Sequence, residues 1–385
     1  MDSISKGLFP GIIIATCCIL LAACMTRNSL DVGAAETPDT SPPIHSEISQ
    51  TQEETIPLTP TPGPVEMEPI YVRVETAEEM ESWAETADAS GLYNHNVILA
   101  ISGDIDPIPW TCIEDCDAVR EVVLEEGGNL HEDFDFAFKF DKITLPSTFH
   151  VEYLHGGITR VPEIEISPEN PYYKMVDGVL YDAKMQIVYY ANRNITEVHL
   201  PDTVREIDIV AFAGCSLLTH VDLPDSVTCI SAFAFDSCRA LTEINLPDSL
   251  LKIWDGAFWR TPSLKRIRLP AGTDYLSMEE QDSVFWAPLF RHECGLQSIV
   301  CEGTNLKLDE SFWYFCAVPE QITQLVFLSG QPEVVDGEYI TGAFPNATVY
   351  YLSKNQTRWA PNGETEWKGC QLVAIDSLDD LPPLN

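Results

Sequence analysis

The dipeptide Leu-Pro recurs four times in the middle of the chain, at a constant spacing of 23 residues. The copies begin at Leu200, Leu223, Leu246 and Leu269. The columns that hold across three successive copies are Val204/Val227/Leu250, Ile207/Ile230/Ile253, Ala211/Ala234/Ala257, Phe212/Phe235/Phe258, Leu218/Leu241/Leu264 and Val221/Ile244/Ile267. A fixed period of this length indicates one supersecondary unit stacked on copies of itself. Because each unit is too small to bury its own apolar side, stacking joins these columns into continuous ladders.

The repeated motif reads L-P-D-x-[VL]-x-x-I-x-x-x-A-F-x-x-[CT]-x-x-L-[TK]-x-[IV]-x, and three full copies lie between Leu200 and Arg268. This motif resembles the BspA-type leucine-rich repeats of bacterial surface proteins. The resemblance implies a β-rich, right-handed repeat solenoid of short strands and short helical or 3-10 turns, closed by a cap at each end. It also implies a role in surface interaction, and it names no ligand.

A strand signature recurs on both sides of the clean copies: an apolar residue, two variable residues, Val or Ile, one variable residue, and a final residue that is usually Leu or Ile. We expect strands at Val119–Leu124, Phe140–Leu145, Val161–Ile166, Ile195–Leu200, Leu218–Leu223, Leu241–Leu246, Leu264–Leu269, Leu296–Cys301 and Ile322–Phe327. Two longer steps indicate insertions near residues 170–192 and 271–294. In the first insertion, two apolar runs separated by a short polar turn predict a β-hairpin.

The first 24 residues have the features of a processed export signal. A short apolar stretch, too short to span a bilayer comfortably, ends in Leu-Ala-Ala-Cys at Cys24. This ending resembles the lipobox of bacterial lipoproteins, which implies that Cys24 is lipidated and becomes the first mature residue. An ordinary secretory signal with a chance cysteine is the alternative. Residues 25–69, rich in Pro, Thr, Ser and Glu, are expected to form a disordered tether.

The folded body is expected to begin near Ile70. The segment Thr76–Glu79 reads as a capping box, followed by a short helix and then by the apolar strand Val97–Ile101, so residues 70–118 are expected to cap the solenoid. The solenoid is assigned to residues 119–342. An aromatic-rich closing segment with an acidic tail follows at residues 343–385.

The net charge of −38 limits the classes of partner. It opposes nucleic-acid binding, which needs Lys and Arg to neutralise phosphates, and it opposes adsorption to anionic lipid, so the membrane is reached only through the lipid anchor. No G-x-S-x-G, P-loop, dinucleotide or H-E-x-x-H motif is present. We therefore expect a binding protein with no cofactor rather than an enzyme.

Cysteine usage is consistent with an exported chain without a full disulfide framework. Twelve cysteines are present, and nine remain outside the first 24 residues, an odd number. Cys215 and Cys238 occupy an apolar column and are expected to be buried. Cys112 and Cys116 are the best candidates for a local disulfide, with a metal site as the alternative.

In each strand the residues that flank the central Val or Ile point away from the core. These columns carry no structural pattern, so they form the candidate binding face: Glu197, His199, His220, Asp222, Glu243, Asn245, Lys265, Arg266 and Arg268. Lys265, Arg266 and Arg268 form the basic group of this face. This group could bind a carboxylate or a sulfate; the alternative is that its charge is compensated by Glu243 and its neighbours.

Four members of this face form a two-by-two block on adjacent strands: Glu197, His199, His220 and Asp222. Two imidazoles with carboxylates suit Zn²⁺ and related metals, which makes this block a candidate metal site. The competing interpretation is cross-strand ion pairing of each histidine with a carboxylate.

The function predicted from these observations is that of a lipid-anchored extracellular repeat protein that mediates adhesion or protein–protein interaction at a bacterial surface. The partner would be an extracellular protein of a host or a neighbouring cell. The alternative is a glycan-binding surface lipoprotein in which exposed aromatic rings stack on sugars. The candidate rings are Trp254, Trp259, Trp286, Trp313 and Trp359.

Overall fold

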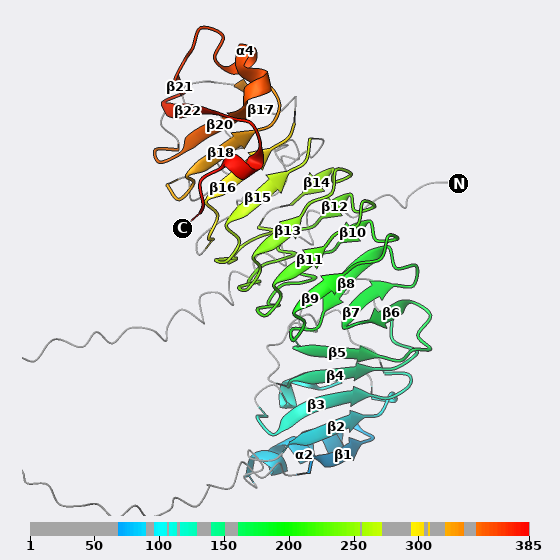
Figure 1. Ribbon diagram of the computed structural model, residues 1–385. Coiled ribbons are helices and arrows are strands. Elements are labelled where there is room, and N and C mark those ends of the chain that lie inside the picture. Colours follow the sequence, from blue (N-terminus) through cyan, green and yellow to red (C-terminus); the bar gives the residue numbers. More distant parts are fainter. Residues whose placement is uncertain are drawn as a thin grey trace, which may run out of the picture. The chain divides into compact units, whose positions relative to one another are not determined.

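The structure is a computed structural model that describes residues 68–89, 96–105, 108–113, 116–128, 140–150, 161–254, 256–271, 294–303, 307–308, 320–334 and 344–384. From Pro69 onward these residues form one compact unit (Figure 1). None of the helices in these ranges is long and apolar enough to cross a membrane. The export signal, Cys24, nearly all of the tether and most of the second insertion lie outside the described residues.

Short strands dominate the unit, and most of them pair in parallel. The strands of the outward face are β1 (Ile70–Val74), β2 (Val97–Ile101), β3 (Val119–Leu124), β4 (Lys142–Leu145), β5 (Glu163–Ile166), β9 (Glu197–His199), β11 (His220–Asp222), β13 (Glu243–Asn245), β15 (Arg266–Leu269), β16 (Ser298–Cys301), β18 (Gln324–Phe327), β20 (Thr348–Leu352) and β22 (Cys370–Ile375). They form the ladders β1-β2-β3-β4-β5, β9-β11-β13 and β15-β16-β18-β20-β22. Each predicted strand is present within its predicted span, which confirms the strand signature and the solenoid.

A second sheet lies on another side of the repeats and was not predicted. Its two-residue strands are β10 (Glu206–Ile207), β12 (Cys229–Ile230) and β14 (Lys252–Ile253), and each pairs in parallel with the equivalent strand of the next copy. Two residues are too few for an alternating pattern to reveal a strand. The connections inside the clean copies are turns rather than the short helical turns expected, because residues such as Val210 (φ 54°) and Phe233 (φ 56°) adopt the left-handed conformation, which ends a helix.

The predicted hairpin of the first insertion is confirmed. Strands β7 (Val179–Asp182) and β8 (Ile187–Ala191) are antiparallel, and a further strand, β6 (Tyr173–Val176), pairs with β7. The tight turn between β6 and β7 is Asp177-Gly178, with φ of 49° and 77° as a hairpin of this type requires. Since β8 also pairs in parallel with β10, the insertion begins the second sheet.

The core consists of like side chains stacked from copy to copy. Phe212, Phe235 and Phe258 stack with ring centroids 5.1 and 5.5 Å apart and nearly parallel planes. Cys215 and Cys238 are fully buried, as predicted, and the thiol of Cys238 donates to the Phe212 carbonyl at 3.2 Å. Repetition of one motif therefore fixes the packing of the whole central region.

The amino-terminal end of the core is covered by helix α2 (Ala77–Ala89) and by a 3-10 turn, η2 (Trp110–Cys112). Thr76 Oγ1 accepts from the backbone N–H of Glu79 at 3.1 Å, and the Glu79 carboxylate accepts from the backbone N–H of Glu75 at 2.9 Å. The reciprocal bond thus reaches one residue further back than a standard capping box. Met80 of α2 is completely buried against the sheet.

The carboxy-terminal end is covered by aromatic residues of the closing segment. Here lie the helical turns η4 (Ser353–Asn355) and α4 (Gln356–Trp359), the short strand β21 (Glu366–Trp367) and the turn η5 (Leu378–Asp380). Trp359 is 1% exposed and packs against the rings of Tyr351, Trp367 and Phe327. A separate pair of short strands, β17 (Lys307–Leu308) and β19 (Glu333–Val334), is parallel.

Candidate functional site

The outward face is built by backbone register, which places equivalent positions of successive copies side by side. Glu197, His220 and Glu243 are direct neighbours along one column. In the next column Asp222 lies between His199 and Asn245. The predicted two-by-two block is therefore confirmed as an arrangement in space, and its side chains project from the short strands β9, β11 and β13.

Within this block, Asp222 contacts both histidines. Its carboxylate accepts from His199 Nδ1 at 2.5 Å and from His220 Nε2 at 2.6 Å. The hydrogen bonds from His220 and His199 hold the pKa of Asp222 below its usual range, because they favour the charged carboxylate. The predicted pairing of His220 with Glu197 is not formed, since Asp222, two residues along the same strand, takes its place.

The block as it stands has the ion-pair arrangement rather than that of a metal site. Among the described residues, no group of three or more His, Cys, Asp or Glu side chains is positioned to hold a metal ion. Glu197 shares a face with His220, but both histidines contact Asp222 instead. A Zn²⁺ site would require Glu197 to turn toward the two histidines. The site stays a prediction, and calorimetric titration of wild type and His220→Ala with Zn²⁺ tests it.

Further toward the amino terminus, the lysine of the outward face is compensated by neighbouring glutamates. Lys142 Nζ lies 2.9 Å from Glu165, 3.7 Å from Glu163 and 3.8 Å from Glu121. Partial burial works against the lysine charge, but the hydrogen bond to Glu165 and the three carboxylates together raise the pKa of Lys142. The lysine is therefore occupied inside the protein and offers little to a partner.

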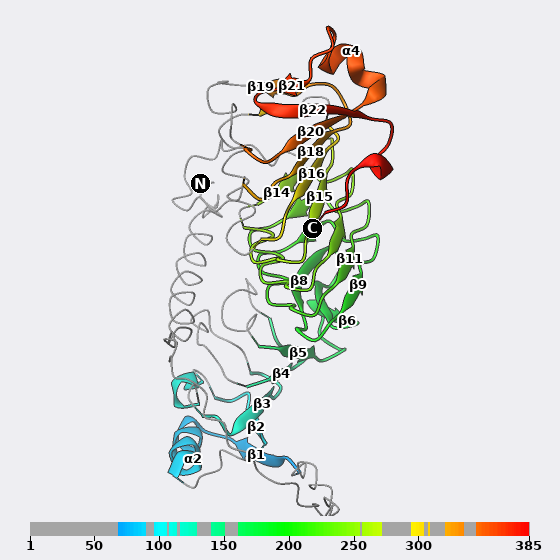
Figure 2. The same ribbon diagram turned by 60° about the vertical axis from the view of Figure 1, so that its left-hand side comes forward.

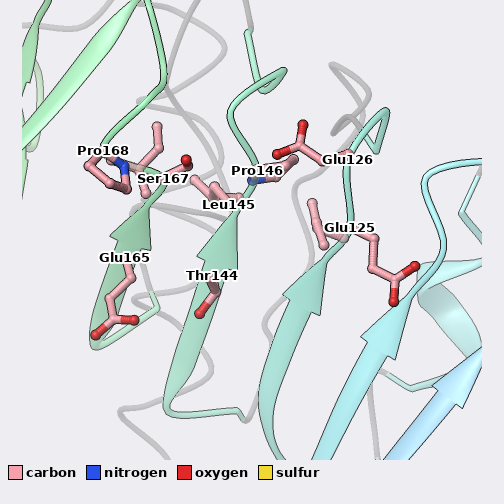
Figure 3. Close-up of a pocket in the computed structure, with 10 residues that line it drawn as sticks. Glu125, Glu126, Thr144, Leu145, Pro146, Glu165, Ser167 and Pro168 are labelled. Atoms are coloured by element: carbon pink, nitrogen blue, oxygen red, sulfur yellow. The ribbon is translucent and has the colours of Figure 1, made fainter.

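A hollow of about 460 Å³ lies beside these strands, at the carboxyl ends of β3, β4 and β5 (Figure 3). Its three carboxylates already have partners. Glu125 accepts from Arg73 at 2.7 and 2.8 Å, Glu126 accepts from the backbone N–H and hydroxyl of Ser147 at 3.1 and 3.0 Å, and Glu165 pairs with Lys142. The hollow thus holds engaged acids and no pairing of nucleophile and base.

The basic group divides into a compensated and an uncompensated part. Arg268 donates to Glu302 at 2.7 Å and lies 3.9 Å from Asp248, so the compensation predicted for this group comes from these residues and not from Glu243. The hydrogen bond to Glu302 raises the pKa of Arg268. Lys265 is half-buried at the start of this strand.

Arg266, in contrast, contacts neutral groups. Its Nε donates to Ser298 Oγ and its Nη2 donates to Gln324 Oε1, both at 3.2 Å. No carboxylate of the described residues pairs with it. Arg266 therefore keeps an uncompensated positive charge on an otherwise acidic surface.

The carboxy-terminal part of the outward face is covered, which corrects the prediction that all of its columns face solvent. Ser298, Val300, Gln324 and Val326 point outward but are at most 3% exposed. After β22 the chain turns back and lies over these strands, so residues 376–384 form a carboxy-terminal strap (Figures 1 and 2). The strap screens this part of the face from solvent.

Beneath the strap, the outward residues are apolar. Val300, Val326, Tyr350 and Ile375 form a separate hydrophobic cluster, joined at its edges by Leu328, Leu352, Val373 and Leu381. We call this cluster, without Leu381, the apolar strip. Sequence reasoning overlooked it, although valine at the same outward position of two successive strands was a usable signal.

Cys112 and Cys116 are free, partly buried thiols, so the predicted local disulfide is not formed in this structure. Both pack against the amino-terminal core beside α2. Burial, together with the nearby charge of Glu81, raises the pKa of Cys112 to about 11, which keeps the thiol protonated and poorly nucleophilic.

The aromatic residues do not form the predicted sugar platform on the part of the surface described here. Trp359 belongs to the carboxy-terminal core, Trp254 lies under Lys252, and Trp259 packs on Phe233. None of these three is among the exposed large apolar side chains. The candidates Trp286 and Trp313 lie outside the described residues.

Comparison with known proteins agrees with this geometry at the level of the repeat. Residues 185–319 match six copies of the BspA type leucine rich repeat region. No curated protein matches the chain.

Among solved structures, the chain is similar to the pneumococcal vaccine antigen PcpA (18% identity, 73% of this chain and 67% of that chain, TM-score 0.49). It is also similar to a leucine rich cell surface protein from Faecalibacterium prausnitzii (20% identity, 60% and 59%, TM-score 0.46). A leucine-rich repeat protein from Eubacterium ventriosum is a third (15% identity, 72% and 90%, TM-score 0.43). The stacked parallel strands together with the six matched copies identify residues 185–319 as a leucine-rich-repeat solenoid of the BspA type.

Proposed function

We propose that this chain is a non-catalytic binding protein that takes a protein partner on the outward face of β9, β11, β13 and β15. The observation that supports this proposal is that charged side chains of this part of the face are more accessible than the outward lysine toward the amino terminus and the covered side chains toward the carboxy terminus. Toward the amino terminus the lysine is neutralised by three glutamates, and toward the carboxy terminus the strap covers the strands. Between them, Glu197, Glu243 and Arg266 remain exposed on a regular backbone.

The chemistry of this central face suits a protein better than a small molecule. It presents charges of both signs on neighbouring strands: Glu197 and Glu243 project from the ladder β9-β11-β13, and Arg266 projects from β15, which contacts β13. Complementary charges of this kind favour a specific orientation and a fast encounter more than they add affinity. We therefore expect binding that weakens as ionic strength rises.

Charge reversal on the face tests the proposal. Arg266→Glu and Glu243→Lys, made separately, should each weaken binding by about tenfold, partly through a lower association rate constant. The ligand in this test is an extracellular protein identified on a protein array. Lys252→Glu is the matched control, because it reverses an exposed charge on the second sheet. If the control weakens binding as much as the two face variants, the partner does not bind at this face.

We further propose that the chain works outside the cell, held to the envelope by lipid on Cys24. The support is the sequence Leu-Ala-Ala-Cys after a short apolar stretch and the Pro- and Thr-rich segment that follows it. Cys24→Ser should abolish incorporation of labelled fatty acid and release the chain from the membrane fraction. A mature wild-type chain that mass spectrometry shows to be unmodified, or to begin at another residue, would rule the anchor out.

A further inference from the structure

The carboxy-terminal strap is attached to the rest of the molecule by few contacts. Leu381 packs on the apolar strip, and the backbone carbonyl of Pro382 accepts a hydrogen bond from Gln324 Nε2 at 2.7 Å. Ser353 donates to Asp376 at the base of the strap. The strap adds no strand to any sheet, since β22 ends at Ile375.

Most of the hydrogen bonds of the strap join residues within the strap itself. Ser377 and Asp380 form a capping box around η5, with Asp380 accepting from the backbone N–H groups of Asp376 and Ser377 at 3.0 and 2.9 Å. Leu378 is 36% exposed and is not a member of the hydrophobic cluster over the strip. A segment with few buried apolar contacts and mainly local hydrogen bonds opens at a low free energy compared with the body that it covers.

The strap covers outward-facing valines that are more deeply buried than the equivalent valine elsewhere on this face. Val123 occupies the same outward column near the amino terminus and is partly exposed, whereas Val300 is 1% and Val326 is 0% exposed. Without the strap, the strip would leave a row of apolar side chains on the outward face of the last four parallel strands. Apolar patches of this kind on a folded surface mark interaction sites.

A polar side chain beside the strip also binds the strap. Gln324 is 3% exposed and uses both ends of its amide, since its oxygen accepts from Arg266 while its nitrogen donates to Pro382. The residues before Pro382 in the strap are Asp379, Asp380 and Leu381. The strap therefore offers a leucine to the strip and a carbonyl to the glutamine. It also carries two acidic residues next to that leucine, and Arg266 has no carboxylate partner among the described residues.

We propose that the apolar strip, with Gln324 and Arg266, is a docking site for a short acidic segment that contains Leu-Pro, and that the chain's own strap occupies this site in the unbound protein. A partner segment of the same chemistry displaces the strap. This site adjoins the charged face proposed above and shares Arg266 with it, but its other residues are different, and its occupant is a peptide segment rather than a folded protein face.

Competition between a free and a tethered segment tests the proposal with the full chain. The probe is a labelled peptide with the sequence of residues 376–385. Wild-type protein should bind it weakly, because the attached strap competes at an effective concentration on the order of millimolar. Leu381→Asp removes the apolar anchor of the strap, so this variant should bind the wild-type peptide at least about tenfold more tightly.

Leu378→Asp provides the matched control. It makes the same chemical change in the same segment, but at a more exposed side chain that is not part of the cluster over the strip, so it should bind the peptide as weakly as wild type does. Circular dichroism and thermal unfolding should show all three proteins equally folded. A second variant, Leu381→Asp with Gln324→Ala, should lose much of the gained affinity, because the donor to the peptide carbonyl is gone.

The outcomes separate clearly. Tight binding to Leu381→Asp alone supports a site held by the strap. Equal binding to Leu381→Asp and wild type, or no binding to either, overturns the proposal. These variants leave Arg266 and Glu243 unchanged, so neither result decides the proposal for the charged central face, which is tested with a different partner.

Discussion

Leu241 is the residue whose truncation most directly tests the stacked core. It is completely buried, and it lies between Leu218 and Leu264 of the neighbouring copies, which are completely buried as well. Alanine at this position removes apolar atoms from the middle of a ladder. The strand that follows Leu241, β13, pairs in parallel with β11 of the preceding copy.

The size of the effect follows from burial and from how far the site can relax. Fully burying a leucine side chain contributes about 1.5–3 kcal/mol. A cavity adds to the loss where neighbours cannot collapse into it, and buried Leu→Ala changes cost about 2–5 kcal/mol in total. Because Leu218 and Leu264 are fixed by the register of their own copies, we expect Leu241→Ala to fall in the upper part of that range, about 3–5 kcal/mol.

Urea unfolding followed by far-ultraviolet circular dichroism measures the loss as a lower midpoint at an unchanged slope. Leu217→Ala is the matched control, because Leu217 is 54% exposed, and it should change the free energy of unfolding by no more than about 0.5 kcal/mol. Glu243→Ala, on the outward face, should be equally mild. Similar losses for Leu241→Ala and Leu217→Ala would refute the assignment of the leucine ladder to the core.

Three further substitutions test local features. Burial raises the pKa of Asp208 to about 6, so the folded state holds this proton more tightly than the unfolded state does. The free energy of unfolding should therefore fall as pH rises from about 4 to about 6. Asp208→Asn should remove that fall and stabilise the protein by about 1–2 kcal/mol at pH 7, as measured by thermal unfolding across pH. Arg260→Ala should lower the free energy of unfolding in urea by about 3–5 kcal/mol, because it leaves the buried carboxylate of Asp236 without its guanidinium. A loss below about 1 kcal/mol would show that solvent already reaches Asp236. Gly256→Ala should lower the unfolding midpoint, since Gly256 has φ of 64° and an added Cβ would lie 2.5 Å from the ring of Phe233; an unchanged midpoint would mean that the ring moves freely.

Local sequence pattern was sufficient for the strands, the ladders and the first insertion. The 23-residue period places equivalent residues in register, because only that register keeps every apolar column in the core. For the same reason, the neighbours His199 and Asp222 could be predicted from spacing alone. The two-residue strands of the second sheet could not, because they are shorter than any pattern that distinguishes a strand from a turn.

The sequence by itself thus determined which residues face the core and which share a column on the outward face. Only the tertiary structure decided what those outward residues contact. Arg268 pairs with Glu302 across an insertion, and Asp222 takes both histidines although the columns offered Glu197 to one of them. The strap returns from the end of the chain to cover Val326. These contacts depend on side-chain rotamers and on chain segments outside the repeat, and a period carries no information about either.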